Sequence, residues 1–196
     1  MKKYIKTIIV VVLLAGLGLG YYYYLSNRTP SKDATEQSIA NEQVAALTTR
    51  DIENNYPQSP KEVVKLYAKI TKAYYETKLS DEQIEQLGTQ ARLLFDDELK
   101  ASQTDEQFLN ALKEDISSYH SVNRYISDYK LQTSNEVKHQ TLNGKEYSSL
   151  IALYYIREGS NLTHSYTRFV LRQDTDGRWK ILYWELVSDS ELRDDE

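Results

Sequence analysis

The chain has 196 residues, a formal net charge of −5 and no cysteine. Without cysteine, the chain has no disulfide, thiolate metal site, cysteine nucleophile or cysteine-linked lipid. Three of the 24 basic residues precede the N-terminal apolar segment and all 29 acidic residues follow it, so the rest of the chain carries −8. An acidic domain repels nucleic-acid phosphates, which argues against nucleic acid as a partner.

The N-terminal segment is predicted to be a membrane anchor over residues 7–25. No residue between Thr7 and Asn27 is charged, and an 18-residue helix from Ile8 to Leu25 is about 27 Å long, close to the ~30 Å hydrocarbon core. All lysines of this region come first, so residues 1–6 are expected in the cytoplasm and the domain outside the cell membrane. The alternative is a cleaved signal peptide, for which only paired glycines within residues 16–20 supply the small residues needed.

Aromatic residues mark both ends of the predicted span. Consecutive tyrosines step about 100° around a helix and therefore form a girdle at one depth, which is typical of the membrane–water interface. The predicted interface residues are Tyr4 at the inner boundary and Tyr21, Tyr22, Tyr23 and Tyr24 at the outer one. Gly16 and Gly20 form a G-x-x-x-G pattern that can support helix dimerisation. The lipid bilayer is thus the first predicted partner.

Residues 26–58 are polar, with few apolar positions. This composition is typical of a stalk that holds a domain away from the membrane. A loose helix between Asp33 and Asn55 stays open as an alternative.

Three helix starts of one design follow. Ser59, Ser80 and Thr104 each precede a Glu or Gln three residues later, the pattern of a capping box. Apolar residues recur at helical spacing after each, which predicts helices from residue 60 to about 77, from 81 to about 99, and from 105 to about 122.

After the third predicted helix, apolar residues recur every 2 residues, as in strands, in place of every 3.6 residues, as in helices. Turn residues separate these alternating runs. Asn143-Gly144 favours a tight hairpin because both residues tolerate positive φ. Further turns are predicted at Gly159 and at residues 174–177. The predicted fold class is α+β, with three N-terminal helices packed on a curved four-stranded antiparallel meander spanning residues 59–188. Residues 189–196 form an acidic tail.

The order of elements, ending in "DGRWKILYWEL", resembles the cone-shaped fold of nuclear transport factor 2 and its relatives. That resemblance implies helices closing the mouth of a bent sheet, although those relatives insert a strand that has no counterpart between the second and third helices here. Residues 56–186, with "YPQSPKEVVKLYAKITKAYYE", "LLFDDELKA" and "RFVLRQDTDGRWKIL", resemble a family of membrane-anchored proteins of Gram-positive bacteria. That resemblance implies an envelope location and supplies no activity.

Chemical motifs are sparse. The three histidines, His120, His139 and His164, lack the spacing of a metal site, and no cofactor is expected. Asp96 and Asp97 are predicted to face solvent, with capping of a neighbouring element or pairing with Arg168 or Arg172 as the alternative.

The candidate pocket or interface was chosen from strand alternation and from the abundance of aromatic residues. It comprises Tyr155, His164, Tyr166, Arg168, Tyr183, Trp184 and Glu185. If these residues lie on the concave face of the predicted curved sheet, we expect them to contact a ligand. If they lie on its other face, they form an exposed surface.

These observations favour a membrane-tethered, extracytoplasmic, non-catalytic binding or scaffolding module whose partner is an envelope protein, a second copy or a small ligand. A subunit of a type IV secretion or conjugation apparatus is the alternative, suggested by architecture only. A small hydrolase or isomerase that uses the cone cavity is a further alternative, because fold alone does not determine function.

Overall fold

The computed structural model describes residues 32–76, 78–188 and 191. The chain divides into two compact units, Met1–Ile39 and Ala40–Glu196. The predicted cytoplasmic tail, the anchor with its tyrosines, and nearly all of the acidic tail lie outside the described residues. Among the described residues, no helix has the length and apolar character needed to cross a bilayer.

The described part of the chain contains five α-helices and five strands, so the α+β class is confirmed. The helices are α2 (Lys32–Thr48), α3 (Pro60–Glu76), α4 (Asp81–Leu93), α5 (Asp97–Ala101) and α6 (Asp105–Ser121). The strands are β1 (Arg124–Leu131), β2 (Lys138–Leu142), β3 (Lys145–Glu158), β4 (Asn161–Gln173) and β5 (Trp179–Val187), with a 3₁₀ turn, η1 (Ser134–Glu136), between β1 and β2. The count differs from the prediction by two helices and one strand.

The predicted helix starts are confirmed. They could be predicted because the capping hydrogen bonds join residues only three positions apart. Ser80 accepts a hydrogen bond from the Gln83 backbone, and the Gln83 side chain accepts one from the Ser80 backbone. Thr104 and Gln107 form the same pair at the start of α6. Each pair satisfies backbone N–H groups that a helix start leaves free.

The predicted second helix is wrong beyond Leu93. The chain leaves the helix at Leu94 because residues 94–96 pair with β5: Ile181 N donates to Leu94 O and Asp96 N donates to Ile181 O, both at 2.8 Å. A new short helix, α5, then begins with Asp96 as its N-cap. The long-range pairing with β5 therefore outweighs the helical propensity of "LLFDDELKA".

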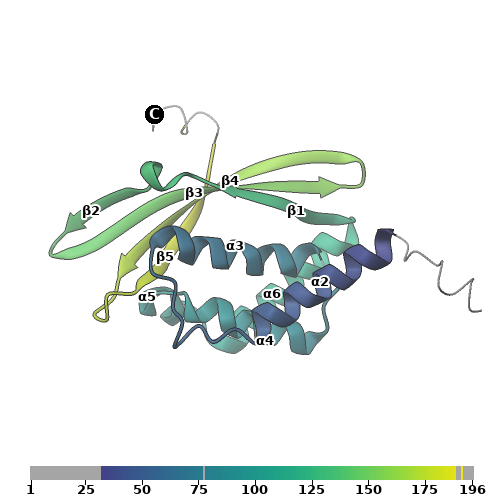
Figure 1. Ribbon diagram of the computed structural model, residues 1–196, viewed down its shortest axis with the longest axis horizontal. Coiled ribbons are helices and arrows are strands. Elements are labelled where there is room, and N and C mark those ends of the chain that lie inside the picture. The colour runs from purple at the N-terminus through teal and green to yellow at the C-terminus, as the bar shows by residue number, and fades with distance from the viewer. Residues whose placement is uncertain (1–31, 77, 189–190, 192–196) are drawn as a thin grey trace, which may run out of the picture. The chain divides into compact units, whose positions relative to one another are not determined.

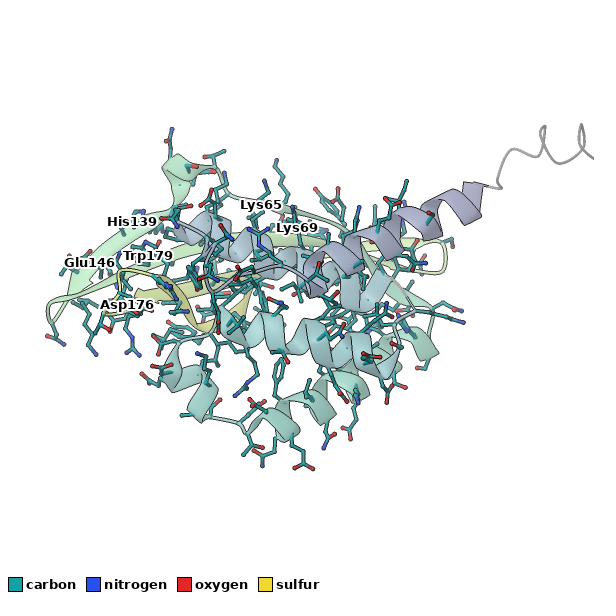
Figure 2. The ribbon with its side chains drawn as sticks, turned by 60° about the horizontal axis from the view of Figure 1, so that its bottom comes forward. Lys65, Lys69, His139, Glu146, Asp176 and Trp179 are labelled. Carbon is teal, nitrogen blue, oxygen red and sulfur yellow. The ribbon has the colours of Figure 1, made fainter. Side chains whose placement is uncertain are left out.

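The sheet is antiparallel, with order β1-β3-β4-β5 and with β2 also paired to β3. β1 and β2 both pair with the same edge of β3, one after the other. The first strand of the predicted four-stranded meander is therefore two strands. The hairpin at Asn143-Gly144 is confirmed, since both residues have positive φ, 52° and 73°. Figure 2 shows Trp179 of β5 beside His139 of β2, with ring centroids 5.8 Å apart.

Figure 1 shows α3, α4 and α6 on one side of the sheet, with α3 nearest to the strands. The core lies between this layer and the sheet. The largest fully buried side chains come from both layers and from the segment before α3: Val44, Ile52, Val63, Val64, Ile70, Leu87, Leu94, Phe95, Leu150, Phe169, Leu171 and Ile181. Gly88 permits close approach of α4 and α6, because a Cβ there would lie 2.7 Å from Leu109 Cδ2.

Part of the predicted stalk belongs to the compact unit that contains the sheet. Residues 40–58 fall in that unit, and Val44, Ile52 and Tyr56 are buried in its core. The Tyr56 hydroxyl donates to Trp179 O at 2.8 Å. A few apolar residues in a polar segment suffice to dock it when each one is buried.

Candidate functional site: an aromatic pocket between the helices and the sheet

A cavity of about 550 Å³ lies between α3, α5, α6 and the helix-facing side of the sheet. Pockets for small ligands are typically about 300–1,000 Å³ and are lined mainly by apolar and aromatic side chains. Eight aromatic residues line this one: Tyr67, Tyr75, Phe95, Phe108, Tyr119, Tyr154, Phe169 and Trp184. The cavity therefore has the size and lining of a small-molecule site.

Trp184 forms one wall of the pocket. Its ring centroid is 5.5 Å from that of Tyr67, 5.7 Å from that of Phe95 and 6.2 Å from that of Phe169. Contacts of this kind hold the rings in defined orientations. Trp184 is still 40% exposed, so it lies where the pocket meets solvent, with Leu186 beside it.

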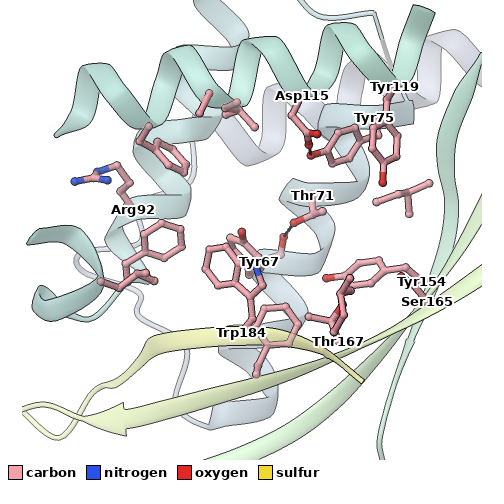
Figure 3. Close-up of a pocket in the computed structure, with 18 of the residues that line it drawn as sticks. Tyr67, Thr71, Tyr75, Arg92, Asp115, Tyr119, Tyr154, Ser165, Thr167 and Trp184 are labelled. Carbon is pink, nitrogen blue, oxygen red and sulfur yellow. Dashed lines mark hydrogen bonds between the residues drawn. The ribbon is translucent and has the colours of Figure 1, made fainter. Parts of the chain in front are cut away.

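The interior of the pocket carries few polar groups. Thr71 Oγ1 donates to Tyr67 O at 3.0 Å. The Tyr154 hydroxyl is buried and forms no well-aligned hydrogen bond within the described part of the chain. Figure 3 shows it directed toward Thr71, whose hydroxyl opposes the effect of burial on the Tyr154 pKa. Burial raises the pKa of Tyr154, so the phenol stays protonated near neutral pH and can donate to a ligand. An unpaired buried polar group is uncommon and costly.

The charged groups at the rim are already paired. The Tyr75 hydroxyl donates to Asp115, and burial, followed by this hydrogen bond, raises the pKa of Tyr75. Arg92 Nε lies 2.6 Å from Asp105, and Arg92 Nη2 donates to Gln103 O at 3.2 Å. Asp115 is thus held by a neutral donor and Arg92 by Asp105, and the apolar walls between them suit a ligand without a charge of its own.

The histidines lie elsewhere. His120 Nε2 is 3.2 Å from Tyr75 O, at the end of α6, His139 contacts Trp179, and His164 is exposed with its ring against Tyr166. None of the three lines the pocket. Over the described ranges, no three His, Asp or Glu side chains are grouped to hold a metal ion.

Most of the sequence-predicted set lies on the other face of the sheet. Along β4, Ser165, Thr167 and Phe169 line the pocket, so the alternate residues His164, Tyr166 and Arg168 point away from the helices. Tyr155, paired with His164, and Glu185, paired with Arg168, share that outer face. These residues do not line this cavity; Tyr166 lines a separate one with Ile151 and Leu153. As a pocket or an exposed interface on the outer face, the set stays a prediction.

A bulge in β5 brings Trp184 to the same face as Ile181, although regular alternation would place the two on opposite faces. The register shifts between Val170 and Leu171, so Ile181 pairs with Leu171 while Tyr183 pairs with Val170. The extra residue in β5 reverses the alternation, as bulges do. Ile181 and Trp184 consequently face the helices, and Tyr183 lies on the outer face. Trp184 is the one member of the predicted set that lines the pocket.

One pattern in the sequence of α3 does indicate the pocket. Tyr67, Thr71 and Tyr75 follow at four-residue spacing on α3, and all three line the cavity. A stripe of amphipathic residues beside an apolar stripe indicates a helix face that is neither fully packed nor fully solvated.

Asp96 corrects the prediction of a solvated acidic pair. Asp96 is 5% exposed, accepts from the Glu98 backbone N at 2.9 Å, and pairs with Arg172 at 2.5 Å and 3.0 Å. Its neighbour Asp97 is exposed, as predicted. The alternative of capping and pairing with Arg172 is therefore confirmed for Asp96.

Comparison with known proteins identifies a family. No curated protein matches the chain. A solved structure described as a 2.5 Å structure from Catenulispora acidiphila is 16% identical, with 68% of this chain and 94% of that chain covered and a TM-score of 0.39. A family model described as "Domain of unknown function (DUF6715)" matches residues 1–184. The chain belongs to this family.

Proposed function

We propose that the chain is a membrane-tethered, extracytoplasmic binding module that holds a small, neutral, amphipathic molecule in the aromatic pocket. The observation that carries the proposal is the cavity of about 550 Å³ into which the buried Tyr154 hydroxyl points. A ligand with an apolar body and one hydrogen-bond acceptor would fill the cavity and satisfy this donor.

Binding fits the pocket better than catalysis. Acid–base chemistry needs a positioned proton donor or acceptor with a pKa near the working pH. The Tyr75 and Tyr154 phenols have pKa values raised further from neutrality, and the Asp115 carboxylate already accepts from Tyr75. Thr71 donates to its own helix. These groups are suited to orienting a ligand.

The finer fold assignment, a cone of the nuclear transport factor 2 kind, belongs to this proposal. Helices on one face of an antiparallel sheet, with a pocket between them, support it. The isolated bridge between Phe95 and Ile181 lies between α4 and α6, the counterparts of the second and third predicted helices, where those relatives insert a strand. A partner from the envelope, or a second copy, on the outer face of the sheet remains an expectation.

Binding can be measured through Trp184, since the chain has only two tryptophans. We expect 4-bromophenol, whose bromine quenches tryptophan on contact, to quench Trp184 in the W179F variant of the full chain in detergent. Thr167→Phe places a ring in the pocket and should weaken the apparent affinity about tenfold or more. Tyr154→Phe should weaken binding less and leave stability unchanged, because its hydroxyl has no well-aligned hydrogen bond to lose.

The control is W184F, which retains Trp179 outside the pocket and should show little quenching. Equal quenching of W179F with and without the Thr167→Phe change would mean that the probe partitions into micelles only, and the pocket proposal would fail.

The tether is tested independently of the pocket. We expect the full chain to stay with bacterial membranes after an alkaline carbonate wash, and its domain to be digested by protease added to intact protoplasts. A variant lacking residues 7–25 should be released. A mature chain that is free of the membrane and starts after Gly20 would contradict the anchor and support a cleaved signal peptide.

A further inference from the structure

A second hollow region lies on the side of α3 that faces α2, and different residues line it. Two adjoining cavities of about 600 and 320 Å³ share Arg50, Lys65 and Lys69 in their linings. Figure 2 shows Lys65 and Lys69 close together on α3, and all three side chains are exposed. We call these two adjoining cavities, with Arg50, Lys65 and Lys69 between them, the basic groove.

The carboxylates of the basic groove are already engaged, one of them with Lys72, whereas the other three cations that line it are not. Glu62 accepts from Gln58 N at 2.9 Å, Glu76 pairs with Lys72 at 3.3 Å, and Asp128 accepts from Tyr129 N at 2.9 Å. Within residues 32–76 and 78–188, the side chains of Arg50, Lys65 and Lys69 form no ion pair or hydrogen bond with any acid. Elsewhere on this acidic chain arginines such as Arg92, Arg124 and Arg172 are paired.

The spacing of these cations works against helix stability. Lys61, Lys65 and Lys69 follow at intervals of four on α3, and Lys72 comes three residues later. Like charges at this spacing repel one another along a helix. A bound anion relieves that repulsion.

Arg50 is held in place beside the lysines. Gln90 Nε2 donates to Thr48 O at 3.1 Å and to Arg50 O at 3.0 Å, which fixes the turn after α2. Ile52 is buried in the core directly after this turn. Because its backbone is already fixed, Arg50 loses only side-chain freedom when it binds an anion, which lowers the entropic cost of binding.

The lining of the larger cavity includes apolar groups, which we call its floor: Ala46, Leu47, Ala73 and the ring of Tyr129. We propose that the basic groove binds the phosphate group of an anionic amphiphile, with the phosphate on Arg50, Lys65 and Lys69 and an apolar part on this floor. Phosphate is the anion that combined Arg and Lys donors bind best. The apolar floor favours an anionic phospholipid as the source over a soluble phosphate. The lipid source rests on the proposed tether, whereas the phosphate site does not.

Lysine footprinting tests the site with the full chain in nanodiscs. Phosphatidylcholine nanodiscs, the same discs with added pyrophosphate, and discs containing phosphatidylglycerol are treated with an acetylating reagent, and modification is located by mass spectrometry. We expect phosphatidylglycerol to slow acetylation of Lys65 and Lys69 about fivefold relative to Lys145, an exposed lysine at the β2–β3 hairpin.

Arg50→Gln keeps both reporter lysines and should abolish most of the protection, with an unchanged melting temperature as the check on folding. Lys145→Gln removes the same charge elsewhere and should retain the protection. Protection by pyrophosphate alone would keep the phosphate site and overturn the lipid source. No protection in either arm, or equal protection of all exposed lysines, would overturn the site. Failure of the tether is seen separately, as chain that does not remain in the discs.

Discussion

Replacing Asp96 by alanine is expected to lower the free energy of unfolding by about 3 kcal/mol, since it removes a helix cap and the buried partner of Arg172. Within the described part of the chain, only the exposed Glu98, 3.2 Å from Arg172 Nη1, remains as an ion-pair partner. Asp96 is 5% exposed, and the side chain of Arg172 is 18% exposed. The pair joins β4 to the start of α5 and is formed by residues 76 positions apart. Burial of both groups makes this interaction stronger than a surface ion pair.

The measurement is urea unfolding of the full chain in detergent, compared with Asp97→Ala, which changes an exposed carboxylate one position away and should leave stability unchanged. A second variant, D96A with Arg172→Met, should recover part of the loss because it removes a half-buried charge whose buried partner is gone. A loss no greater than that of the Asp97 variant would show that the pair contributes little.

Phe95→Ala is expected to cost about 3–5 kcal/mol of unfolding free energy, the range for truncating a buried aromatic residue. Phe95 is 2% exposed, and its ring centroid lies 5.7 Å from those of Tyr67 and Trp184 and 5.8 Å from that of Phe108. The ring therefore joins α3, α6 and β5 at one wall of the pocket. Its removal leaves a cavity that these neighbours cannot close without moving.

Urea unfolding again measures the loss. Phe95→Leu should cost less than half as much, because leucine fills most of the space, and Leu162→Ala, at a position 55% exposed, should be nearly neutral. An alanine variant as stable as the leucine variant would mean that the wall collapses to fill the space. The tryptophan emission of Trp184 should shift to longer wavelength in the alanine variant only.

The elements that could be predicted are those whose residues decide their own conformation. The capping boxes at Ser80 and Thr104 pair atoms three residues apart, and Asn143 and Gly144 adopt positive φ within their own turn. The α+β class follows from the order of the apolar periods, which is also local.

The pocket could not be predicted from strand alternation, because bulges interrupt it. In β1 the register shifts between Ile126 and Asp128, and in β4–β5 between Val170 and Leu171. Each shift moves the following residues of one strand to the opposite face. The bulge in β5 places Trp184 on the same face as Ile181. His164 and Arg168 lie on the outer face by the regular alternation of β4, whose pairing with β3 has no shift, and which face the helices cover is decided by tertiary packing.

Helix starts, the hairpin turn and the predicted membrane segment can be read from the sequence, because each depends on residues within about one helical turn or one apolar run. The end of α4 at Leu93, the burial of Asp96 against Arg172, and the packing of Val44 and Ile52 in the core cannot. These outcomes depend on contacts between segments far apart in the chain, where a buried partner outweighs local propensity.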